Sequence, residues 1–474
     1  MKNVYILFVF LIISCSKPTD KPNLLFILVD DLGWTDVSYN GSDFYETHNI
    51  DRLSLNSMLF YNAYASSSVC SPTRAAIMTG KHPARVNITD WIPGLEEQPS
   101  YNNKNKPLIG PQDLNELPLS EITIAEVLKK NGYKTFYSGK WHLGSEGHYP
   151  EDQGFDINIG GFEKGSPMGG YYSPYKNPKL EDGPEGEYLT DRLTQETIDF
   201  IDSRDQSKPF AAFLAFYNVH TPVQENKEFY DYYKEKLKGY DDIEPVTKKE
   251  GDAITLLNQR NAKYASMVHA TDNNVGKIIN YLKENDLYDD TLIVFTSDNG
   301  GLSTLKRIAP TSVYPLRAGK GWLYEGGIKI PQLIKLPKQV YREIIYQPVV
   351  SHDLFPTILN AMDISYDIKN IDGMNLNNIF LDKEFKRDYI FWHFPHYHGS
   401  LWKPGSAIRN NQWKLVKFYE DNTQELYNLY EDSSESNNLV EVHPEIVSKL
   451  SNKMDEIKIE LNANKTTVNK NYKK

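Results

Sequence analysis

An alternation of short strand segments and helical segments constrains the fold of this chain more than any other feature. Residues 23–29 form a continuous apolar run, as expected of a strand buried on both faces of a parallel sheet. Further strand segments lie at residues 133–138, 210–216 and 291–296. Helical patterns lie at residues 50–60, 122–131, 193–201 and 261–285. This alternation predicts an α/β fold with a large, mostly parallel central sheet flanked by helices.

Each strand segment is followed by polar residues that are suited to chemistry. They are Asp30 and Asp31, Lys140 and His142, His220, and Asp298 and Asn299. Ligands of parallel α/β sheets bind at the carboxyl ends of the strands, so we expect these side chains to meet at one edge. The three aspartates and the asparagine offer hard oxygen ligands, which suit Ca²⁺ or Mg²⁺ rather than zinc. Taken singly, each of these residues is more often a solvated turn, a surface charge or a structural histidine.

Residues 70–80 read as the beginning of a helix that starts with a cysteine. Pro72 suits an early helical position, because its missing N–H needs no partner there. The backbone N–H groups and the positive end of the helix dipole point back at Cys70 and form an anion site. Arg74 can add a planar fork of donors for a tetrahedral oxyanion. The alternative, common for a lone cysteine, is a buried core residue.

The string Cys-x-Pro-x-Arg, followed after four residues by Thr79-Gly80, resembles the signature of type I sulfatases. In that family the cysteine is oxidised after translation to formylglycine (3-oxoalanine), an aldehyde that is hydrated in the resting enzyme. The resemblance runs from about residue 23 to the end of the C-terminal sheet and implies an alkaline-phosphatase-like core. It makes Cys70 the precursor of the nucleophile and implies a formylglycine-generating maturation enzyme as a partner.

The resemblance extends to the metal-binding segments of the family. The stretch that contains Asp30 and Asp31 and the string Ser-Asp-Asn-Gly at residues 297–300 look like its two calcium-binding segments. The ligands that this implies are Asp30, Asp31, Asp298, Asn299 and the modified residue 70. One Ca²⁺ is expected, and Mg²⁺ is the alternative, because the choice between them rests on the resemblance. The metal would polarise the sulfate and lower the pKa of the aldehyde hydrate.

The resemblance also assigns catalytic roles. Lys140, in Gly-Lys-Trp-His, would steady the nucleophile, and His142 would be the base that breaks down the intermediate. His220, in His-Thr-Pro, would act as the acid for the leaving alcohol. Lys320, in Gly-Lys-Gly, would contact the sulfate. Together with Arg74, the two lysines would offset the charge of the oxyanion.

The N-terminus resembles an export signal. Lys2 precedes apolar residues 4–13, which are too few to span a bilayer and suit a signal-peptide core. Ile12-Ile13-Ser14-Cys15 resembles a bacterial lipobox, which implies a signal peptide at residues 1–14, lipidation of Cys15 by the export machinery, and a tether at 15–21. The alternative is a simple secretory signal. We expect an exported lipoprotein in the periplasm, outer membrane or cell surface, with no disulfide, because each of the two cysteines has its own modification.

After about residue 372 the pattern changes to short strands and one helix. The strands are expected at residues 389–394, 405–409, 413–418 and 425–428, and the helix at 444–461. They predict a small C-terminal α+β subdomain with an antiparallel sheet at residues 373–474, beside a catalytic domain at 22–372. We expect the loop at 393–398, with Trp402 and Arg409, to reach over the sheet ends and touch sugar, and we take His396 as its contact residue. A zinc centre in the His-rich string 393–398 is disfavoured, because no cysteine or clear carboxylate completes it.

The formal net charge of −11 argues against broad nucleic-acid binding. Attraction for a sulfated substrate must then be local, from cations such as Arg74, Lys81, Arg85, Lys306, Arg307, Arg317 and Lys320. The expected function is hydrolysis of sulfate esters on a sulfated polysaccharide or oligosaccharide. A lipid-anchored, exported sulfatase suggests a bacterium that uses sulfated glycans, either algal polysaccharides or host glycosaminoglycans. The acidic composition, rich in Asn, Lys and Tyr, favours an algal glycan such as ulvan, carrageenan or an agar-type galactan.

Two other functions fit parts of this sequence. A phosphatase or phosphodiesterase of the same superfamily would place Ser or Thr at the nucleophile and usually binds two zinc ions. A surface lipoprotein that binds glycans without catalysis would need no complete site. Cys70 and the full set of mapped residues argue against both.

Overall fold

The computed structural model describes residues 21–92, 105–366 and 371–473. The expected signal peptide at residues 1–14, the lipidated Cys15 and most of the tether lie outside these ranges. Among the described helices, none has the length and apolar character needed to cross a bilayer.

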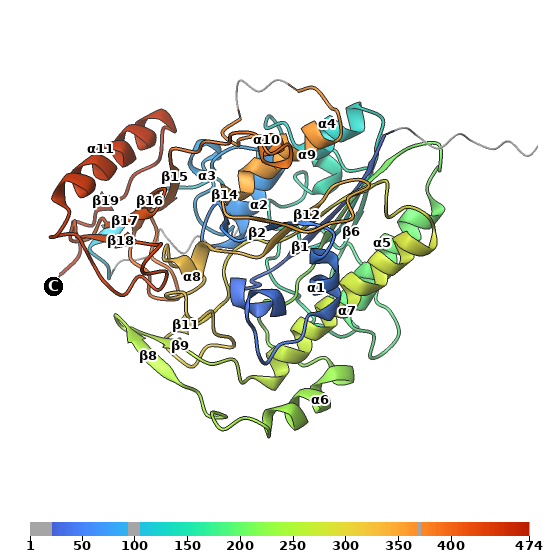
Figure 1. Cartoon of the computed structure of the whole chain (residues 1–474), viewed down its shortest axis with the longest axis horizontal. Helices are drawn as coiled ribbons and strands as arrows, with labels where there is room; N and C mark the ends of the chain where they lie inside the picture. The colour runs from blue at the N-terminus through green and yellow to red at the C-terminus, as the bar shows by residue number, and fades with distance from the viewer. Residues whose placement is uncertain (1–20, 93–104, 367–370, 474) are drawn as a thin grey trace, which may run out of the picture.

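An eight-stranded sheet forms the centre of the molecule (Figure 1). In spatial order its strands are β13 (Glu343–Ile345), β2 (Met58–Phe60), β12 (Gln332–Lys335), β10 (Thr291–Ser297), β1 (Asn23–Val29), β7 (Phe210–Ala215), β5 (Lys134–Gly139) and β6 (Ile157–Ile159). β10, β1, β7, β5 and β6 are parallel neighbours, while β12 runs antiparallel to both β10 and β2. The predicted mixed α/β fold with a mostly parallel sheet is confirmed.

Helices cover both faces of this sheet, because its inner strands are apolar on both sides. Along β1, Leu25 and Ile27 face one core and Leu24 and Phe26 face the other. The first core is covered by α1 (His48–Ser54), α5 (Leu189–Ser203), α6 (Lys227–Leu237) and α7 (Ala262–Glu284). The second is covered by α2 (Cys70–Thr79), α4 (Ile124–Lys130), α9 (Leu354–Ala361) and α10 (Asn377–Phe380). Figure 1 shows these two groups on opposite sides of the strands.

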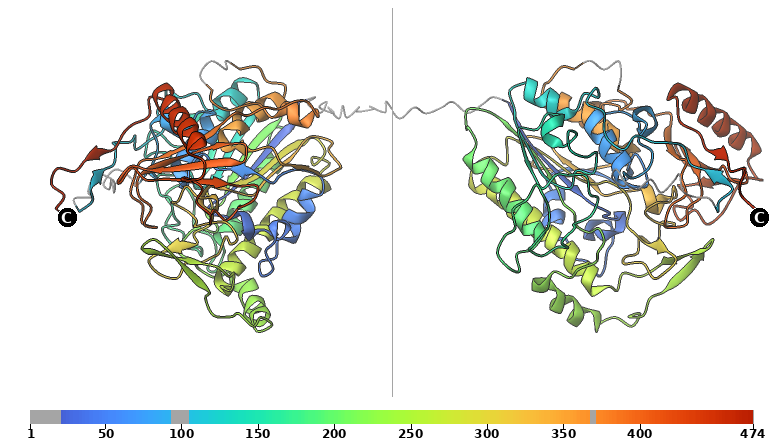
Figure 2. Two further views of the ribbon diagram at one scale, coloured as in Figure 1. Left: turned by 60° about the vertical axis from the view of Figure 1, so that its left-hand side comes forward. Right: turned by 180° about the vertical axis from the view of Figure 1, so that it is seen from behind.

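The C-terminal part forms a separate antiparallel sheet at one end of the molecule (Figure 2). Its four strands are β15 (Ile390–Phe394), β16 (Gly405–Asn410), β17 (Trp413–Phe418) and β18 (Gln424–Asn428). Helix α11 (Pro444–Glu460) packs on one face of this sheet. The other face packs against residues of the central unit, including Tyr64 and α8 (Glu325–Ile328).

Short elements complete the described chain. They are the strands β3 (Ala63–Tyr64), β4 (Leu108–Ile109), β8 (Thr247–Glu250), β9 (Ala253–Leu256), β11 (Thr304–Leu305), β14 (Val349–Val350) and β19 (Thr467–Val468), the helix α3 (Pro83–Val86), and 3-10 turns at Trp34–Asp36, Ser38–Asn40, Pro150–Gln153 and Ser351–Asp353. The pairing of β19 with β4 ties the end of the chain to a distant segment, and no sequence pattern pointed to it.

The expected helix at residues 50–60 is wrong over its second half. Helix α1 ends at Ser54, a turn follows, and Met58–Phe60 form strand β2 between β12 and β13. A short apolar run fits a buried helix or a buried strand equally well. Pairing with two neighbouring strands satisfies the backbone groups of this run and decides the outcome.

A buried ion cluster joins the C-terminal sheet to the central unit. Lys414 on β17 has no exposed surface, and its Nζ lies 3.0 Å from Glu325 and 2.9 Å from Glu435. Glu435 also accepts the backbone N–H of Glu325 at 2.6 Å. Removing the cation would leave two buried carboxylates facing each other, which is strongly unfavourable.

We therefore expect Lys414→Met to lower the free energy of unfolding by about 3–5 kcal/mol, measured by denaturant unfolding. Lys417→Met is the matched control, since Lys417 lies on the same strand, is only half-buried and makes no ion pair with any described residue. Its effect is expected to stay within about 0.5 kcal/mol. Equal losses in the two variants would contradict this role of the ion cluster.

Candidate active site

Helix α2 places Cys70 at its first position. Val69 before it is extended, Pro72 lies in the first turn, and Gly80 ends the helix with φ of 69°. Cys70 is buried, and burial raises the pKa of its thiol to about 12, although Lys140 and Lys320 lower it. An unmodified Cys70 is therefore a protonated thiol at neutral pH and a poor nucleophile.

The predicted catalytic and metal-binding residues lie together around Cys70. Asp30 and Asp31 follow β1, Asp298 follows β10, Lys140 follows β5 and His220 comes shortly after β7. All these strand ends belong to the parallel part of the sheet, which is why they meet at one edge. Lys320 arrives from a separate loop, and its Nζ lies 3.4 Å from the Sγ of Cys70.

Each of the three buried carboxylates pairs with its own cation. Distances between the charged atoms are 2.7 Å for Lys140 and Asp30, 2.8 Å for Arg74 and Asp298, and 2.6 Å for Lys320 and Asp31. Arg74 also donates to the backbone carbonyl of Lys140 at 2.5 Å. These pairs fix the positions of the carboxylates before any ligand enters.

The carboxylates still crowd one another. Burial, reinforced by the charges of Asp298 and Asp31, raises the pKa of Asp30 to about 8 despite Lys140. Burial also opposes ionisation of Asp298, but Arg74 and Lys140 outweigh it and lower the pKa of that carboxyl. A bound cation would relieve this repulsion.

The donor atoms at this edge fit a hard divalent cation. The Oδ1 atoms of Asp30 and Asn299 are buried and have no hydrogen-bond partner among the described residues. Ligand atoms of Asp30, Asp298 and Cys70 lie within 4.8 Å of one another, as do those of Asp31, His220 and Cys70. A set dominated by carboxylate and amide oxygens suits Ca²⁺ or Mg²⁺.

The two predicted catalytic histidines are held in defined orientations. The Nε2 of His142 lies 2.7 Å from the carbonyl of Ile92, so it must donate, which leaves Nδ1 as the free acceptor. The Nδ1 of His220 likewise donates to the carbonyl of Thr221 at 2.7 Å. Burial lowers the pKa of His220 to about 3 and holds the pKa of His142 well below its usual value, so both rings are neutral at neutral pH.

Backbone strain marks the same strand ends. Asp31 has φ of 61° and His142 has φ of 60°, a left-handed conformation that non-glycine residues adopt at a cost. Such outliers persist where the surrounding structure holds them, and they cluster at functional sites. Here the two residues with left-handed backbone are Asp31, a candidate metal ligand, and His142, a candidate base.

A pocket of about 470 Å³ opens over Cys70. Of the predicted residues, Cys70, His142, His220 and Lys320 line it. Arg74 and Lys140 are fully buried behind it and contact the carboxylates. The carboxylates of Asp30, Asp31 and Asp298 do not line it, but each has an oxygen within 4.8 Å of the Cys70 Sγ.

Sequence reasoning did not single out several residues of the pocket wall, among them Trp91, Lys164 and His398. His398 lies in the C-terminal His-rich string, which is the only signal that pointed to it. Its Nδ1 pairs with the hydroxyl of Ser400 at 2.7 Å. Burial, together with the charge of Lys320, lowers the pKa of His398 to about 3. A neutral histidine from the C-terminal part thus completes the pocket.

The three residues expected to reach over the sheet ends do not line the pocket over Cys70, which corrects their expected position. His396 is buried and bonds to the hydroxyl of Thr89 at 2.7 Å. Trp402 packs edge-on against Trp322, with ring centroids 5.7 Å apart. Arg409 bonds to the Tyr64 hydroxyl and to a neighbouring carbonyl. None of the three lines the pocket over Cys70, because the loop turns inward at His396 and only two residues later reaches the pocket.

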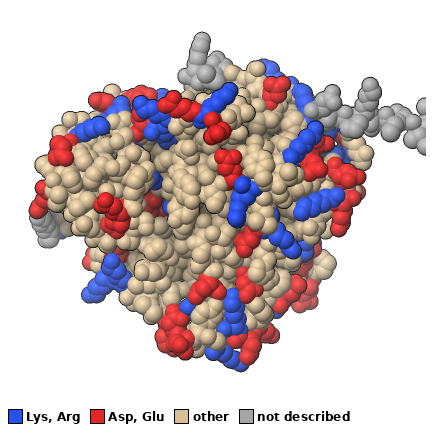
Figure 3. All heavy atoms as spheres, viewed as in Figure 1, with Lys and Arg blue, Asp and Glu red and all other residues tan. Residues whose placement is uncertain are grey.

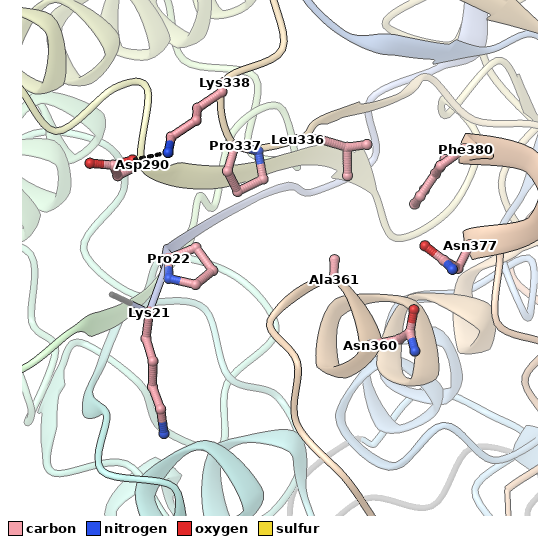
Figure 4. A pocket seen from close by; sticks show the side chains of 10 residues that line it. All are labelled: Lys21, Pro22, Asp290, Leu336, Pro337, Lys338, Asn360, Ala361, Asn377 and Phe380. Carbon is pink, nitrogen blue, oxygen red and sulfur yellow. Dashed lines mark ion pairs between the residues drawn. The ribbon is translucent and has the colours of Figure 1, made fainter. Parts of the chain in front are cut away.

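Another hollow, of about 550 Å³, lies at the opposite edge of the sheet (Figure 4). Pro22 and Asp290 stand directly before β1 and β10, so this hollow is at the amino ends of these strands. Lys338 pairs with Asp290 there at 4.0 Å. None of the expected site residues lines this hollow. The candidate active site is therefore at the carboxyl ends of the strands.

Figure 3 shows how charge is distributed on one face of the molecule. Basic and acidic side chains are intermixed on the face of Figure 3, without one large basic patch there. Lys320, which lines the pocket over Cys70, is one of the local cations expected to attract an anionic substrate.

The fold and this site define a hydrolase of the alkaline-phosphatase-like type with a cysteine in the nucleophile position. Residues 22–364 match the family model described as Sulfatase, and residues 318–460 match the one described as N-sulphoglucosamine sulphohydrolase, C-terminal. The chain belongs to the sulfatase family and is a sulfuric ester hydrolase.

Relatives match along most of the chain. A sulfatase of Formosa agariphila is 28% identical over 514 residues, covering 92% of this chain and 88% of that protein. Human N-acetylgalactosamine-6-sulfatase is 29% identical over 402 residues, covering 80% and 70%. The structure of Ps i-CgsB in complex with k-i-k-neocarrahexaose is 29% identical, covers 92% of both chains and has a TM-score of 0.73.

The packing of Gly165 against His142 gives a prediction. A Cβ on Gly165 would lie 2.4 Å from the His142 ring, which its bond to Ile92 holds in place. We expect Gly165→Ala to displace the ring and to lower kcat about 100-fold, with little change in the thermal unfolding midpoint.

Gly399→Ala is the matched control, because Gly399 lines the same pocket and a Cβ there meets nothing within 4 Å. Its kcat is expected to stay near that of the unchanged protein. If both alanine variants kept full kcat, the orientation of His142 would not matter for turnover.

Proposed function

We propose that this sulfatase removes sulfate from a sulfated glycan, with a nucleophile made from Cys70. The observation that carries the proposal is the position of Cys70. It sits at the N-terminus of α2 on the floor of the pocket, between Lys320 and the buried carboxylates. An anion such as a sulfate ester is favoured there by the helix dipole and the lysine.

Two groups complete the proposed site. Formylglycine at residue 70, made by a maturation enzyme, would supply the attacking oxygen as its hydrate. A Ca²⁺ held by the donors of Asp30, Asp31, Asp298 and Asn299 would polarise the sulfate, with Mg²⁺ as the alternative. The unpartnered oxygens of Asp30 and Asn299 support this assignment.

The three cations near Cys70 have two different proposed roles. Lys320 lines the pocket and is positioned to bind a sulfate oxygen and offset its charge. Arg74 and Lys140 do not line it, so we assign them the task of holding Asp298 and Asp30. This differs from the expectation that all three cations face the oxyanion.

The histidines are assigned to proton transfer. His142 presents an unprotonated Nδ1, which suits the base that takes a proton from the group at residue 70. His220 presents an unprotonated Nε2, 3.9 Å from a carboxylate oxygen of Asp31. To act as the acid for the leaving alcohol, His220 must first take up a proton, which a bound anion favours by raising its pKa.

A carrageenan-type galactan is the substrate class that we favour. Ps i-CgsB, whose structure holds k-i-k-neocarrahexaose, shares 29% identity with this chain over nearly its whole length. Ulvan and agar-type galactans are the other algal candidates.

We also propose that the protein is exported and that Cys15 is lipidated, on the sequence of residues 1–21. The mass of the N-terminal peptide from the membrane fraction tests this proposal.

The reaction is tested by sulfate release from carrageenan oligosaccharides, with phosphate monoesters assayed in parallel. We expect release of sulfate and negligible release of phosphate. Cys70→Ala should lower kcat about 10⁴-fold or more, as for loss of a nucleophile. Cys15→Ala, which changes the other cysteine, should leave kcat unchanged in solution. Release of phosphate but not sulfate would contradict the reaction, whereas sulfate release only from ulvan would contradict the substrate class alone.

Metal binding is tested without turnover. We expect Ca²⁺, added after chelation, to raise the thermal unfolding midpoint by about 2–4 °C, because it binds only the folded chain. Asp30→Asn should abolish this rise. Asp290→Asn, at the opposite edge of the sheet, should keep it. A rise that survives in Asp30→Asn would place the cation elsewhere.

A further inference from the structure

A second pocket, of about 440 Å³, shares no lining residue with the pocket over Cys70. The turn after β1, the β2–β3 turn, the loop before and after α8, and the C-terminal sheet all contribute to it. The loop that presents Lys320 to the catalytic pocket also presents Leu316 and Lys329 to this one. The two pockets are therefore joined by one segment of chain.

Lys329 is the unusual residue of this pocket. It is only 5% exposed, and its Nζ lies 4.4 Å from the ring centroids of both Trp34 and Tyr61. No carboxylate of the described residues pairs with it, because both oxygens of the neighbouring Glu325 are taken by Tyr64 and Lys414. Two aromatic faces stabilise the cation and leave its hydrogen-bond donors to the pocket.

The charges around Lys329 favour an anion. Three buried cations, Lys329, Arg409 and Lys414, face two buried carboxylates, Glu325 and Glu435. Burial, helped by the charges of Arg409 and Lys414 and opposed by Glu325, lowers the pKa of Lys329 to about 8. An excess of positive charge is thus held in a chain whose formal net charge is −11. A negative ligand would balance it.

Aromatic side chains form the walls. The rings of Trp34 and Tyr61 meet edge to face at 5.1 Å, and Tyr61 meets Tyr346 at 5.5 Å. Tyr346 and Tyr430 are 63% and 65% exposed, which is high for such large side chains. Trp34 is 6% exposed, and its indole N–H has no hydrogen-bond partner among the described residues. Exposed rings beside an unused buried donor suit the apolar face and the hydroxyls of a sugar.

We propose that this pocket binds an anionic sugar unit of a sulfated glycan, separate from the unit being hydrolysed. Lys329 and the free edge of Arg409 take the sulfate, and Tyr346 and Tyr430 contact the sugar ring. Only the choice of a sulfated glycan as ligand rests on the proposed function. This pocket would keep the polymer bound to the protein between successive hydrolysis steps in the catalytic pocket.

The test measures binding without turnover, by affinity electrophoresis of Cys70→Ala in gels containing carrageenan, desulfated carrageenan or no polysaccharide. We expect retardation by carrageenan alone, and a Kd at least about tenfold weaker when Lys329→Met is added. Tyr430→Ala, at an exposed position, is expected to weaken binding as well and guards against misfolding of the buried variant. Lys338→Met removes a surface lysine at the opposite edge and is expected to change nothing.

A second measurement separates this pocket from the catalytic one. In the chain with Cys70 intact, Lys329→Met should leave kcat/KM for a small aryl sulfate unchanged and raise KM for carrageenan. Unchanged retardation in both Lys329→Met and Tyr430→Ala would overturn the proposal, and so would equal retardation by desulfated carrageenan. Because electrophoresis needs no reaction, an inactive enzyme that is still retarded through Lys329 would contradict the proposed function and not this inference.

Discussion

Three carboxylates buried together at one edge of a parallel sheet are the constraint on which the rest of this structure depends. β1 and β10 are adjacent and parallel, so Asp30, Asp31 and Asp298 emerge side by side. Buried carboxylates are tolerated only when cations or a metal compensate them. Each is matched by one cation from elsewhere in the chain, Lys140, Lys320 or Arg74. These pairings bring α2, with Cys70 at its start, onto the same edge.

Much of this arrangement could be predicted because its signals are local. The apolar run of β1 and the candidate metal ligands Asp30 and Asp31 are contiguous in sequence, so one short stretch predicts both the strand and the ligands. Local patterns could not predict the positions of residues that depend on contacts distant in sequence. His398 and His396 are two positions apart, and only the path of their loop decides which one reaches the pocket. Met58–Phe60 likewise became a strand through partners distant in sequence.

The distribution of cations explains how an acidic chain can act on anionic polymers. A few cations are buried, where salt screens them little, and Lys320 and Lys329 among them line pockets. Lys320 lines the pocket over Cys70, and Lys329, nine residues later, lines the proposed glycan-binding pocket. One short segment of chain therefore contributes a cation to both pockets.

The central claim is that residue 70 works as an aldehyde made from cysteine. The most direct measurement is the mass of the tryptic peptide spanning residues 53–74, taken from protein made in its native host. A mass lower than that of the thiol form by the difference between a cysteine and an aldehyde, or the mass of its hydrate, is the predicted result. An unmodified cysteine in folded protein that still releases sulfate would contradict the claim.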